Sequence, residues 1–256
     1  PESMEVKAVY AAPFHNDRSE GPEDGMEKSY QEIIKIMDKM NYSPEGKVFR
    51  GSVDYLSDDE TPQSSEAAKD LIKKAKAMPE GEKLYVAAIG AITNVASAIL
   101  MEPEIIKNIV VIWLGGNSHD WSHAKEFNLM QDVSAARVLF DCGVPFIQIP
   151  CMGVASHLQT TVPELKYYLS ESEIGQYLVE IVDNYTSEPY GWSKVIWDIS
   201  VIGYLVNKDW VNTNLVHSPI LTDQVTLSFD QSRHFIKKAY WINRDGIFAD
   251  LFKKLN

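Results

Sequence analysis

The sequence is poor in cysteine and has no long apolar run. Cys142 and Cys151 are the two cysteines among 256 residues, and their spacing is not that of a Cys-x-x-Cys pair. This excludes a secreted scaffold held by several disulfides and does not indicate a zinc site. Charged or polar residues interrupt every apolar stretch before it reaches the length of about 18 residues needed to cross a bilayer. We therefore expect a protein of the reducing cytoplasm, and not an integral membrane protein.

Basic residues are also in deficit, with 24 lysines and arginines against 36 acidic residues and a formal net charge of -12. This charge repels phosphate backbones and anionic lipids, so we expect neither a nucleic-acid nor a membrane partner. An acidic balance suits a protein that binds a hard cation, although most of these carboxylates are expected to be solvated surface. The length and the 45% hydrophobic content favour one large domain with a substantial core.

Short apolar runs alternate with helical segments over the first 150 residues. The runs at 84–90 and 109–116 are continuous, end in glycine and flank a helical segment, which is the pattern of a βαβ unit. Strands that are buried on both faces have such unbroken runs, so we predict an α/β fold with an open, mostly parallel sheet and helices on both faces. Further strands are expected at 6–12, 47–50 and 145–150. Helices are expected at 26–40, 66–78 and 132–143, the last with Asp132 as N-cap and Gly143 as its left-handed end.

The C-terminal part of the sequence is more helical. Helices are predicted over 162–185 and 193–207, and an amphipathic helix over 246–256 closes the chain. Two late strands, at 224–230 and 238–243, are expected to form a hairpin.

Polar residues follow several of the predicted strands. Asn16 follows the first strand, Thr93 and Asn94 follow the run at 84–90, and the segment 117–128 follows the run at 109–116. Because ligands bind at the carboxyl ends of parallel strands, all of these residues are expected at one edge of the sheet. Thr93 and Asn94 are also good N-caps, so a structural role competes with one in which the turn directs a backbone carbonyl at a calcium ion.

The segment after Gly116 contains two histidines and a Glu-x-Asn pair. His119 and His123 are four residues apart but lack the glutamate of a His-Glu-x-x-His motif, which disfavours zinc. Glu126 and Asn128 would point the same way in an extended segment and offer an acceptor and an amide to neighbouring hydroxyls. A surface salt bridge and a turn would explain these two residues equally well.

Asp198 lies in an apolar helical stretch, next to Trp197. An unpaired carboxylate is costly there unless it is hydrogen-bonded or bound to a metal. The structural alternative is a hydrogen bond to a nearby helix N-terminus. Trp197 is by default a core residue.

Four segments, in order, resemble one family: "VYAAPFHN", "AAIGAITNVASAI", "WLGG" followed by "EFNLMQDVSAARVLFDCGVP", and "WDISVIGYLV". They are similar to the calcium-dependent nucleoside hydrolases of the inosine-uridine preferring type, and the Glu-Phe-Asn segment is the most specific. The resemblance covers most of the chain up to about Val206. It implies a ribosyl site at the carboxyl edge of the sheet with one Ca²⁺, which binds the sugar hydroxyls and a nucleophilic water.

Carried over residue by residue, the resemblance makes the Thr93 carbonyl and the Asp198 carboxylate metal ligands. The residues that would bind the ribose are Glu126, Asn128 and Asn16. Asp120 stands near the place of a sugar-binding asparagine, so Asn117 is a candidate for that role and Trp121 for the base pocket. Purine-specific members carry a tryptophan before the late aspartate, as Trp197 does here, and an indole stacked on a protonated purine contributes about 1–2 kcal/mol. The resemblance thus favours purine nucleosides and purine salvage, and a homodimer or homotetramer.

The family's N-terminal Asp-x-Asp motif, which would supply most calcium ligands and the general base, is not in this sequence. We therefore expect roughly 25–35 residues, one strand and one helix, upstream of Pro1, with the catalytic aspartate among them. Residues 1–256 would then be a single nucleoside hydrolase-like domain without its first strand and helix. The loops at 52–65 and 186–192 are candidate flaps over the site.

The function predicted from the sequence is calcium-dependent hydrolysis of the N-glycosidic bond of ribonucleosides to ribose and free base. This reaction passes through an oxocarbenium-like state and needs an activated water. Two alternatives stay open: a non-catalytic ribosyl- or sugar-binding protein of the same fold, and a hydrolase of another glycoside.

Overall fold

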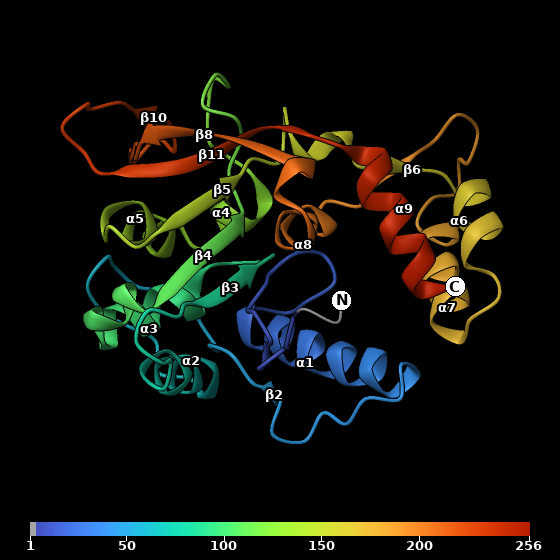
Figure 1. The fold of residues 1–256 in the computed structure, drawn as a ribbon, viewed down its shortest axis with the longest axis horizontal. Helices are drawn as coiled ribbons and strands as arrows, with labels where there is room; N and C mark the ends of the chain where they lie inside the picture. The colour runs from blue at the N-terminus through green and yellow to red at the C-terminus, as the bar shows by residue number, and fades with distance from the viewer. Residues whose placement is uncertain (1–3) are drawn as a thin grey trace.

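The computed structural model describes residues 4–256 and is built around a five-stranded sheet (Figure 1). The strand order is β3 (Leu84–Ala88), β4 (Ile109–Leu114), β5 (Phe146–Ile149), β11 (Phe235–Ile242) and β8 (Val211–His217). Neighbouring strands are parallel from β3 to β11, and β8 runs antiparallel to β11. The predicted mostly parallel α/β sheet is confirmed.

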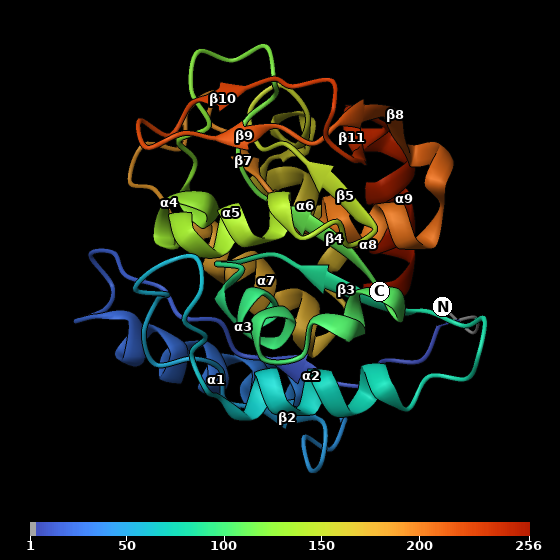
Figure 2. The same cartoon turned by 90° about the vertical axis from the view of Figure 1, so that its left-hand side faces the viewer.

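Helices cover both faces of this sheet, as Figures 1 and 2 show. Side chains alternate along β4: Val111 and Trp113 belong to one core cluster, and Ile112 and Leu114 to the other. The first cluster is completed by α2 (Glu66–Lys76), α3 (Thr93–Met101) and α5 (Val133–Asp141). The second is completed by α6 (Val162–Leu169), α7 (Glu173–Asp183), α8 (Ile199–Val206) and α9 (Arg244–Leu255). Burial on both faces explains the unbroken apolar runs of the central strands.

The other elements lie around this core. β1 (Val9–Tyr10) and β2 (Val48–Phe49) form a separate parallel pair, so the first predicted strand is shorter than expected and pairs with β2. The other elements are α1 (Pro22–Lys39), α4 (Phe127–Gln131), β6 (Gln159–Thr160), β7 (Lys194–Val195), β9 (Ile220–Leu221), β10 (Leu227–Ser228), and the short 3₁₀ helices η1 (Pro103–Lys107), η2 (Ala155–His157) and η3 (Lys208–Trp210). Within residues 4–256, no helix is long and apolar enough to span a membrane.

The ends of α5 agree with the sequence prediction. Asp132 precedes the helix, and its carboxylate accepts a hydrogen bond from the backbone N–H of Ala135 at 2.9 Å. Gly143, just after the helix, has φ of 76°, a left-handed conformation that glycine adopts without steric cost.

Two predictions for the C-terminal part are wrong in detail. The expected hairpin of 224–230 with 238–243 does not form, because β10 pairs with β9 while β11 pairs with β8. The asparagines in "VNTNLVH" are poor strand formers and concealed β8 in the sequence. The segment 193–207 is also not helical throughout: Lys194–Val195 form β7, which pairs with β6, and α8 begins only at Ile199.

Candidate functional site

Three parallel strands end at one edge of the sheet and lead into the loops that carry the candidate residues. β3, β4 and β5 are neighbours and end at Ala88, Leu114 and Ile149. The carboxyl edge of a parallel sheet is where loops converge to bind ligands in this class of fold. We refer to this edge and its loops as the rim.

Glu126 is fixed at the rim by three backbone N–H groups. It is the N-cap of α4, where its carboxylate accepts hydrogen bonds from Asn128 N at 3.0 Å and Leu129 N at 3.2 Å. Gly116, just after β4, donates the third bond at 2.9 Å. A carboxylate at a helix N-terminus is stabilised by the free N–H groups there. The negative charge of Glu126 therefore has a defined position and orientation.

Asn128 is buried beside Glu126 and is oriented by the strands themselves. Its Nδ2 donates to the carbonyl oxygen of Leu114 at 2.9 Å and to that of Ile89 at 3.3 Å. Both amide hydrogens are thereby used, and the side-chain oxygen is the group left to accept a bond from a ligand hydroxyl.

Asp198 precedes α8, which packs against β3 and β4. The residue as a whole is exposed, but its carboxyl group is surrounded by protein, which raises its pKa to about 6. Desolvation is the largest cause, the negative charge of Glu126 adds to it, and the positive charge of Lys194 opposes it. Glu126 therefore acts on Asp198 through its charge, and α8, which Asp198 precedes, lies against the strands that lead to the rim.

Thr93 and Asn94 hold the start of α3 against the rest of the rim. The hydroxyl of the fully buried Thr93 donates to the Asp132 carboxylate at 2.7 Å. The Asn94 side chain accepts from Ser52 N at 2.8 Å and donates to the carbonyl oxygen of Ala11 at 2.8 Å. Neither residue is the N-cap that the sequence suggested, because Ile92 occupies that position without a side-chain cap. Both side chains instead bind neighbouring segments, and the calcium prediction concerned the Thr93 backbone carbonyl.

Asp132 does more than cap α5. It is 2% exposed, and besides Ala135 N and the Thr93 hydroxyl it accepts a bond from Leu56 N at 3.0 Å. Burial raises the pKa of Asp132, although the three hydrogen bonds act in the opposite direction. This carboxylate ties the loop at 52–65, a candidate flap, to α3 and α5.

Asn16 and Asn117 both make local hydrogen bonds. The Asn16 side chain accepts from Arg18 N at 2.8 Å, and the neighbouring His15 exchanges backbone hydrogen bonds with the Gln131 side chain at the end of α4. Asn117 is 2% exposed, with its Nδ2 directed at the carbonyl oxygens of His123 and Lys125 and its Oδ1 at Met152 N. Asn16 therefore lies next to the helix that carries Asn128, while Asn117 fixes the shape of its own loop.

The remaining candidates surround these residues. Trp197 is half-buried and packs against the second core cluster. Asp120 is exposed, with Lys238 as an ionic neighbour at 4.0 Å, and Trp121 is exposed as well. His119 contacts Gln148 through Nε2 at 2.9 Å.

Cys151 was missed by the sequence interpretation. It follows β5 by two residues and is 5% exposed, and burial, with a smaller effect of the negative charges of Glu126 and Asp198, raises the pKa of its thiol. Its position after a predicted strand was the available signal, but a single cysteine without a partner motif gave no reason to select it.

The rim fits part of the coordination set of a hard cation. Calcium takes roughly six to eight oxygen ligands, and a bound cation would relieve the repulsion between Asp198 and Glu126. Among residues 4–256, however, no group of three or more His, Cys, Asp or Glu is placed to hold a metal ion. Among the side chains of the described residues, the Asp198 carboxylate is therefore the predicted donor that is present, and the set is not complete.

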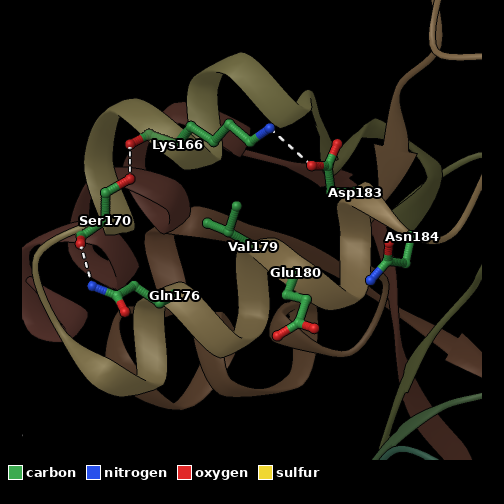
Figure 3. A pocket seen from close by; sticks show the side chains of 7 residues that line it. All are labelled: Lys166, Ser170, Gln176, Val179, Glu180, Asp183 and Asn184. Carbon is green, nitrogen blue, oxygen red and sulfur yellow. Dashed lines mark hydrogen bonds and ion pairs between the residues drawn. The ribbon is translucent and has the colours of Figure 1, made fainter.

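A surface recess of about 380 Å³ lies elsewhere, between α6 and α7 (Figure 3). Its polar groups bind one another: Lys166 pairs with Asp183 at 2.8 Å, and the Gln176 side chain donates to the carbonyl oxygen of Ser170 at 2.8 Å. The candidate site is therefore the rim and not this recess.

The fold and the rim define an α/β protein with polar and acidic groups gathered at the carboxyl edge of a parallel sheet. The family model for inosine-uridine preferring nucleoside hydrolases matches residues 8–238, and the chain belongs to this family. The resemblance noted in the sequence is confirmed.

Named relatives and solved structures agree with this assignment. The chain is 33% identical over 119 residues to "Probable uridine nucleosidase 2" of Arabidopsis thaliana, covering 45% of this chain and 36% of that protein. It is 30% identical over 162 residues to "Pyrimidine-specific ribonucleoside hydrolase RihB" of Escherichia coli K12 / DH10B, covering 59% of this chain and 50% of the relative. The chain thus spans about half the length, or less, of these two relatives.

Among solved structures, a purine-preferring ribonucleoside hydrolase from Gardnerella vaginalis is similar with a TM-score of 0.75 at 19% identity, covering 90% of this chain and 85% of that one. The plant nucleoside hydrolase PpNRh1 is similar with a TM-score of 0.72 at 17% identity, covering 90% and 86%. At these identities the likeness shows the fold.

Proposed function

We propose that the protein hydrolyses the N-glycosidic bond of ribonucleosides to ribose and a free base. The observation that carries this proposal is the Glu126 carboxylate, which three backbone N–H groups hold at the rim beside Asn128, in a chain that belongs to the family. Water adds its oxygen to the anomeric carbon, the bond to the base nitrogen breaks, and the proton from water goes to the departing base.

Different residues of the rim would have different roles in this reaction. The Glu126 carboxylate would accept hydrogen bonds from sugar hydroxyls, and the Asn128 side-chain oxygen would accept another. Asp198 is ionised above about pH 6, and its negative charge would stabilise the positive charge that develops on the sugar. We assign the general base to none of residues 4–256.

Calcium dependence is part of the proposal. Asp198 and the Thr93 backbone carbonyl would be its ligands, and the bound ion would lower the pKa of a coordinated water. The support for this is the chemistry of the donors at the rim together with the resemblance to calcium-dependent hydrolases.

Removal of divalent cations should therefore abolish activity. Protein treated with a chelator is expected to release reducing sugar from inosine or uridine more than about 100-fold more slowly, because a bound cation contributes several kcal/mol to the transition state. Added Ca²⁺ should restore the rate. Unchanged turnover in excess chelator would rule out the metal-dependent reaction, and no turnover of any nucleoside with Ca²⁺ present would rule out the proposed activity.

We propose a preference for purine nucleosides on the basis of Trp197, although the two sequence relatives are named for uridine and pyrimidine. Replacement of Trp197 by alanine should lower kcat/KM for inosine about tenfold more than for uridine, because the indole stabilises a protonated purine by roughly 1–2 kcal/mol. The control is Trp241→Ala, which removes a half-exposed indole on β11. Equal losses for inosine and uridine would contradict the purine assignment.

Binding of a ribosyl compound without cleavage is the second candidate function. It is favoured by the incomplete set of metal-binding side chains among the described residues. The effector XopQ, solved in complex with adenosine diphosphate ribose, has a related fold, with a TM-score of 0.66 at 12% identity over 98% of this chain. Calorimetric titration with ribose and adenosine diphosphate ribose, run beside the turnover assay, separates binding from hydrolysis.

A further inference from the structure

Lys238 is a buried lysine at the rim. It lies on β11, is 8% exposed, and is the cross-strand partner of Gln148 near the carboxyl end of β5. Aligned residues of neighbouring strands point to the same face of a sheet, so the two side chains are neighbours. Lysine is almost never buried without a partner of opposite charge. The burial of Lys238 therefore requires an explanation.

The protein matches the charge of Lys238 poorly. Its ionic neighbour is Asp120, whose Oδ1 lies 4.0 Å from the lysine Nζ and whose side chain is 88% exposed. This distance is too long for a hydrogen bond, and the ammonium group donates none to any other of residues 4–256. The three N–H donors of this lysine are thus available to a ligand.

Gln148 connects Lys238 to the backbone that holds Glu126. Its Nε2 donates to the carbonyl oxygen of Gly115 at 3.0 Å, and the next residue, Gly116, donates its N–H to the Glu126 carboxylate at 2.9 Å. Gln148 is fully buried. Lys238 and the Glu126 carboxylate therefore lie on either side of one fixed glutamine and a short stretch of backbone.

His119 is the other polar side chain bound to Gln148. Because Gln148 Nε2 donates to Gly115, the Gln148 oxygen accepts the bond from His119 Nε2 at 2.9 Å. Burial lowers the pKa of His119, the bond to Gln148 opposes this, and the charge of Lys238 adds to it. The imidazole is therefore neutral at pH 7, and Lys238 supplies the positive charge of this group.

A buried ammonium group at this place favours an anionic ligand. The chain as a whole has a formal net charge of -12 and would repel an anion elsewhere. A neutral sugar does not compensate the cost of burying a charge, whereas an anion with several acceptor oxygens does. Phosphate is such an anion, and it forms strong, charge-assisted hydrogen bonds with lysine.

We propose that Lys238 is a phosphate-binding residue beside the sugar site, and that the ligand of this protein is a ribosyl compound with a phosphate on its ribose. This inference rests on the proposed function, because it takes the sugar to bind at Glu126. It adds a phosphate group to the proposed substrate and leaves the bond that is cleaved unchanged.

The test is calorimetric titration with ribose, ribose 5-phosphate and inorganic phosphate. Ribose 5-phosphate should bind the original protein at least about tenfold more tightly than either of the others, because a hydrogen bond to a charged group is added to the sugar contacts. Lys238→Met, which keeps the apolar stem, should bind ribose 5-phosphate no more tightly than ribose. Lys238→Arg should keep the preference. The matched control is Lys237→Met, which removes an exposed lysine of the same strand and should leave all three affinities unchanged.

Asp120→Asn separates phosphate binding from a purely structural pair. The proposal predicts that this variant binds ribose 5-phosphate as tightly as the original protein or up to about threefold more tightly, because a competing negative charge is removed. Loss of the preference for ribose 5-phosphate in Asp120→Asn would mean that Lys238 acts only by holding the loop through Asp120. Thermal unfolding of each variant checks that the fold is retained.

Three results would overturn the inference: an affinity for ribose 5-phosphate no higher than for ribose, a preference that survives in Lys238→Met, or inorganic phosphate that binds as tightly as ribose 5-phosphate. The last result would separate the anion site from the sugar site. These titrations do not depend on turnover. If the Lys238-dependent preference is found but no nucleoside is cleaved, hydrolysis fails and the phosphate site stands. If inosine is cleaved and the preference is absent, the phosphate site fails and hydrolysis stands.

Discussion

Replacing Asp198 with asparagine is expected to lower kcat/KM for a ribonucleoside by about 1,000-fold, because several kcal/mol of stabilisation of the transition state depend on a charge at this position. The amide has nearly the same shape as the carboxylate but neither its negative charge nor its affinity for a hard cation. The measurement is release of reducing sugar in the presence of Ca²⁺. A variant that retains a tenth of the original activity would remove Asp198 from the proposed mechanism.

The same substitution should stabilise the metal-free fold at alkaline pH. The pKa of Asp198 is about 6 in the folded protein and 3.8 ordinarily, so the folded state binds the proton more tightly than the unfolded state. Protonation therefore stabilises the fold, and this contribution is complete below about pH 4 and lost as the pH rises through about 6. With chelator present, Asp198→Asn should unfold at a higher temperature than the original protein at pH 8, and at a similar temperature at pH 4.

Added Ca²⁺ should have the opposite effect on the difference in unfolding temperature between Asp198→Asn and the original protein. A cation that binds the folded state raises the unfolding temperature by mass action, so the original protein should gain stability and Asp198→Asn should gain less. The control is Asp209→Asn, which alters an exposed aspartate in η3. If both variants respond to Ca²⁺ alike, Asp198 is not a ligand of the ion.

The second large effect is expected at Asp132. Replacement by alanine leaves three buried donors without their acceptor: Leu56 N, the Thr93 hydroxyl and Ala135 N. Each unpaired buried donor costs roughly 1–3 kcal/mol, so three of them should lower the free energy of unfolding by at least about 3 kcal/mol in total. For a chain of this length the unfolding temperature should drop by roughly 10 °C.

Thr161→Ala is the matched control for Asp132. Thr161 is also an N-cap and accepts from Glu164 N, but it is not fully buried, so its loss should cost about 1 kcal/mol. Urea unfolding of both variants gives the comparison. Equal losses would mean that Asp132 acts as an ordinary cap and does not join the 52–65 loop to α3.

The sequence was sufficient for the central strands of the sheet, because strands that are buried on both faces have unbroken apolar runs. The apolar runs ending at Gly90 and Gly116 correspond to β3 and β4, and the cap and stop of α5 were identified from residue chemistry alone. The propensities of single residues did not predict the strands whose formation depends on pairing with a distant strand. β8 is a strand because it pairs with β11, not because "VNTNLVH" favours one.

The candidate site could likewise be predicted only in part from the sequence. Glu126, Asn128 and Asp198 were selected because their segments resemble those of the family, since their positions alone left structural alternatives open. The hydrogen bonds that fix them could not be predicted, because they come from backbone atoms of distant segments such as Gly116 and Leu114. Cys151 was missed for that reason, because the charges that act on its thiol belong to residues distant in the sequence.

Two hydrogen bonds join the backbone of His15 to the side chain of Gln131, 116 residues further along the chain. Contacts of such long sequence separation close large loops and form late, after local helices and neighbouring strands. We therefore expect the contact that places Asn16 beside α4 to form late in folding. If the sugar binds as proposed, a partly folded chain with most of its sheet would still lack one side of the site.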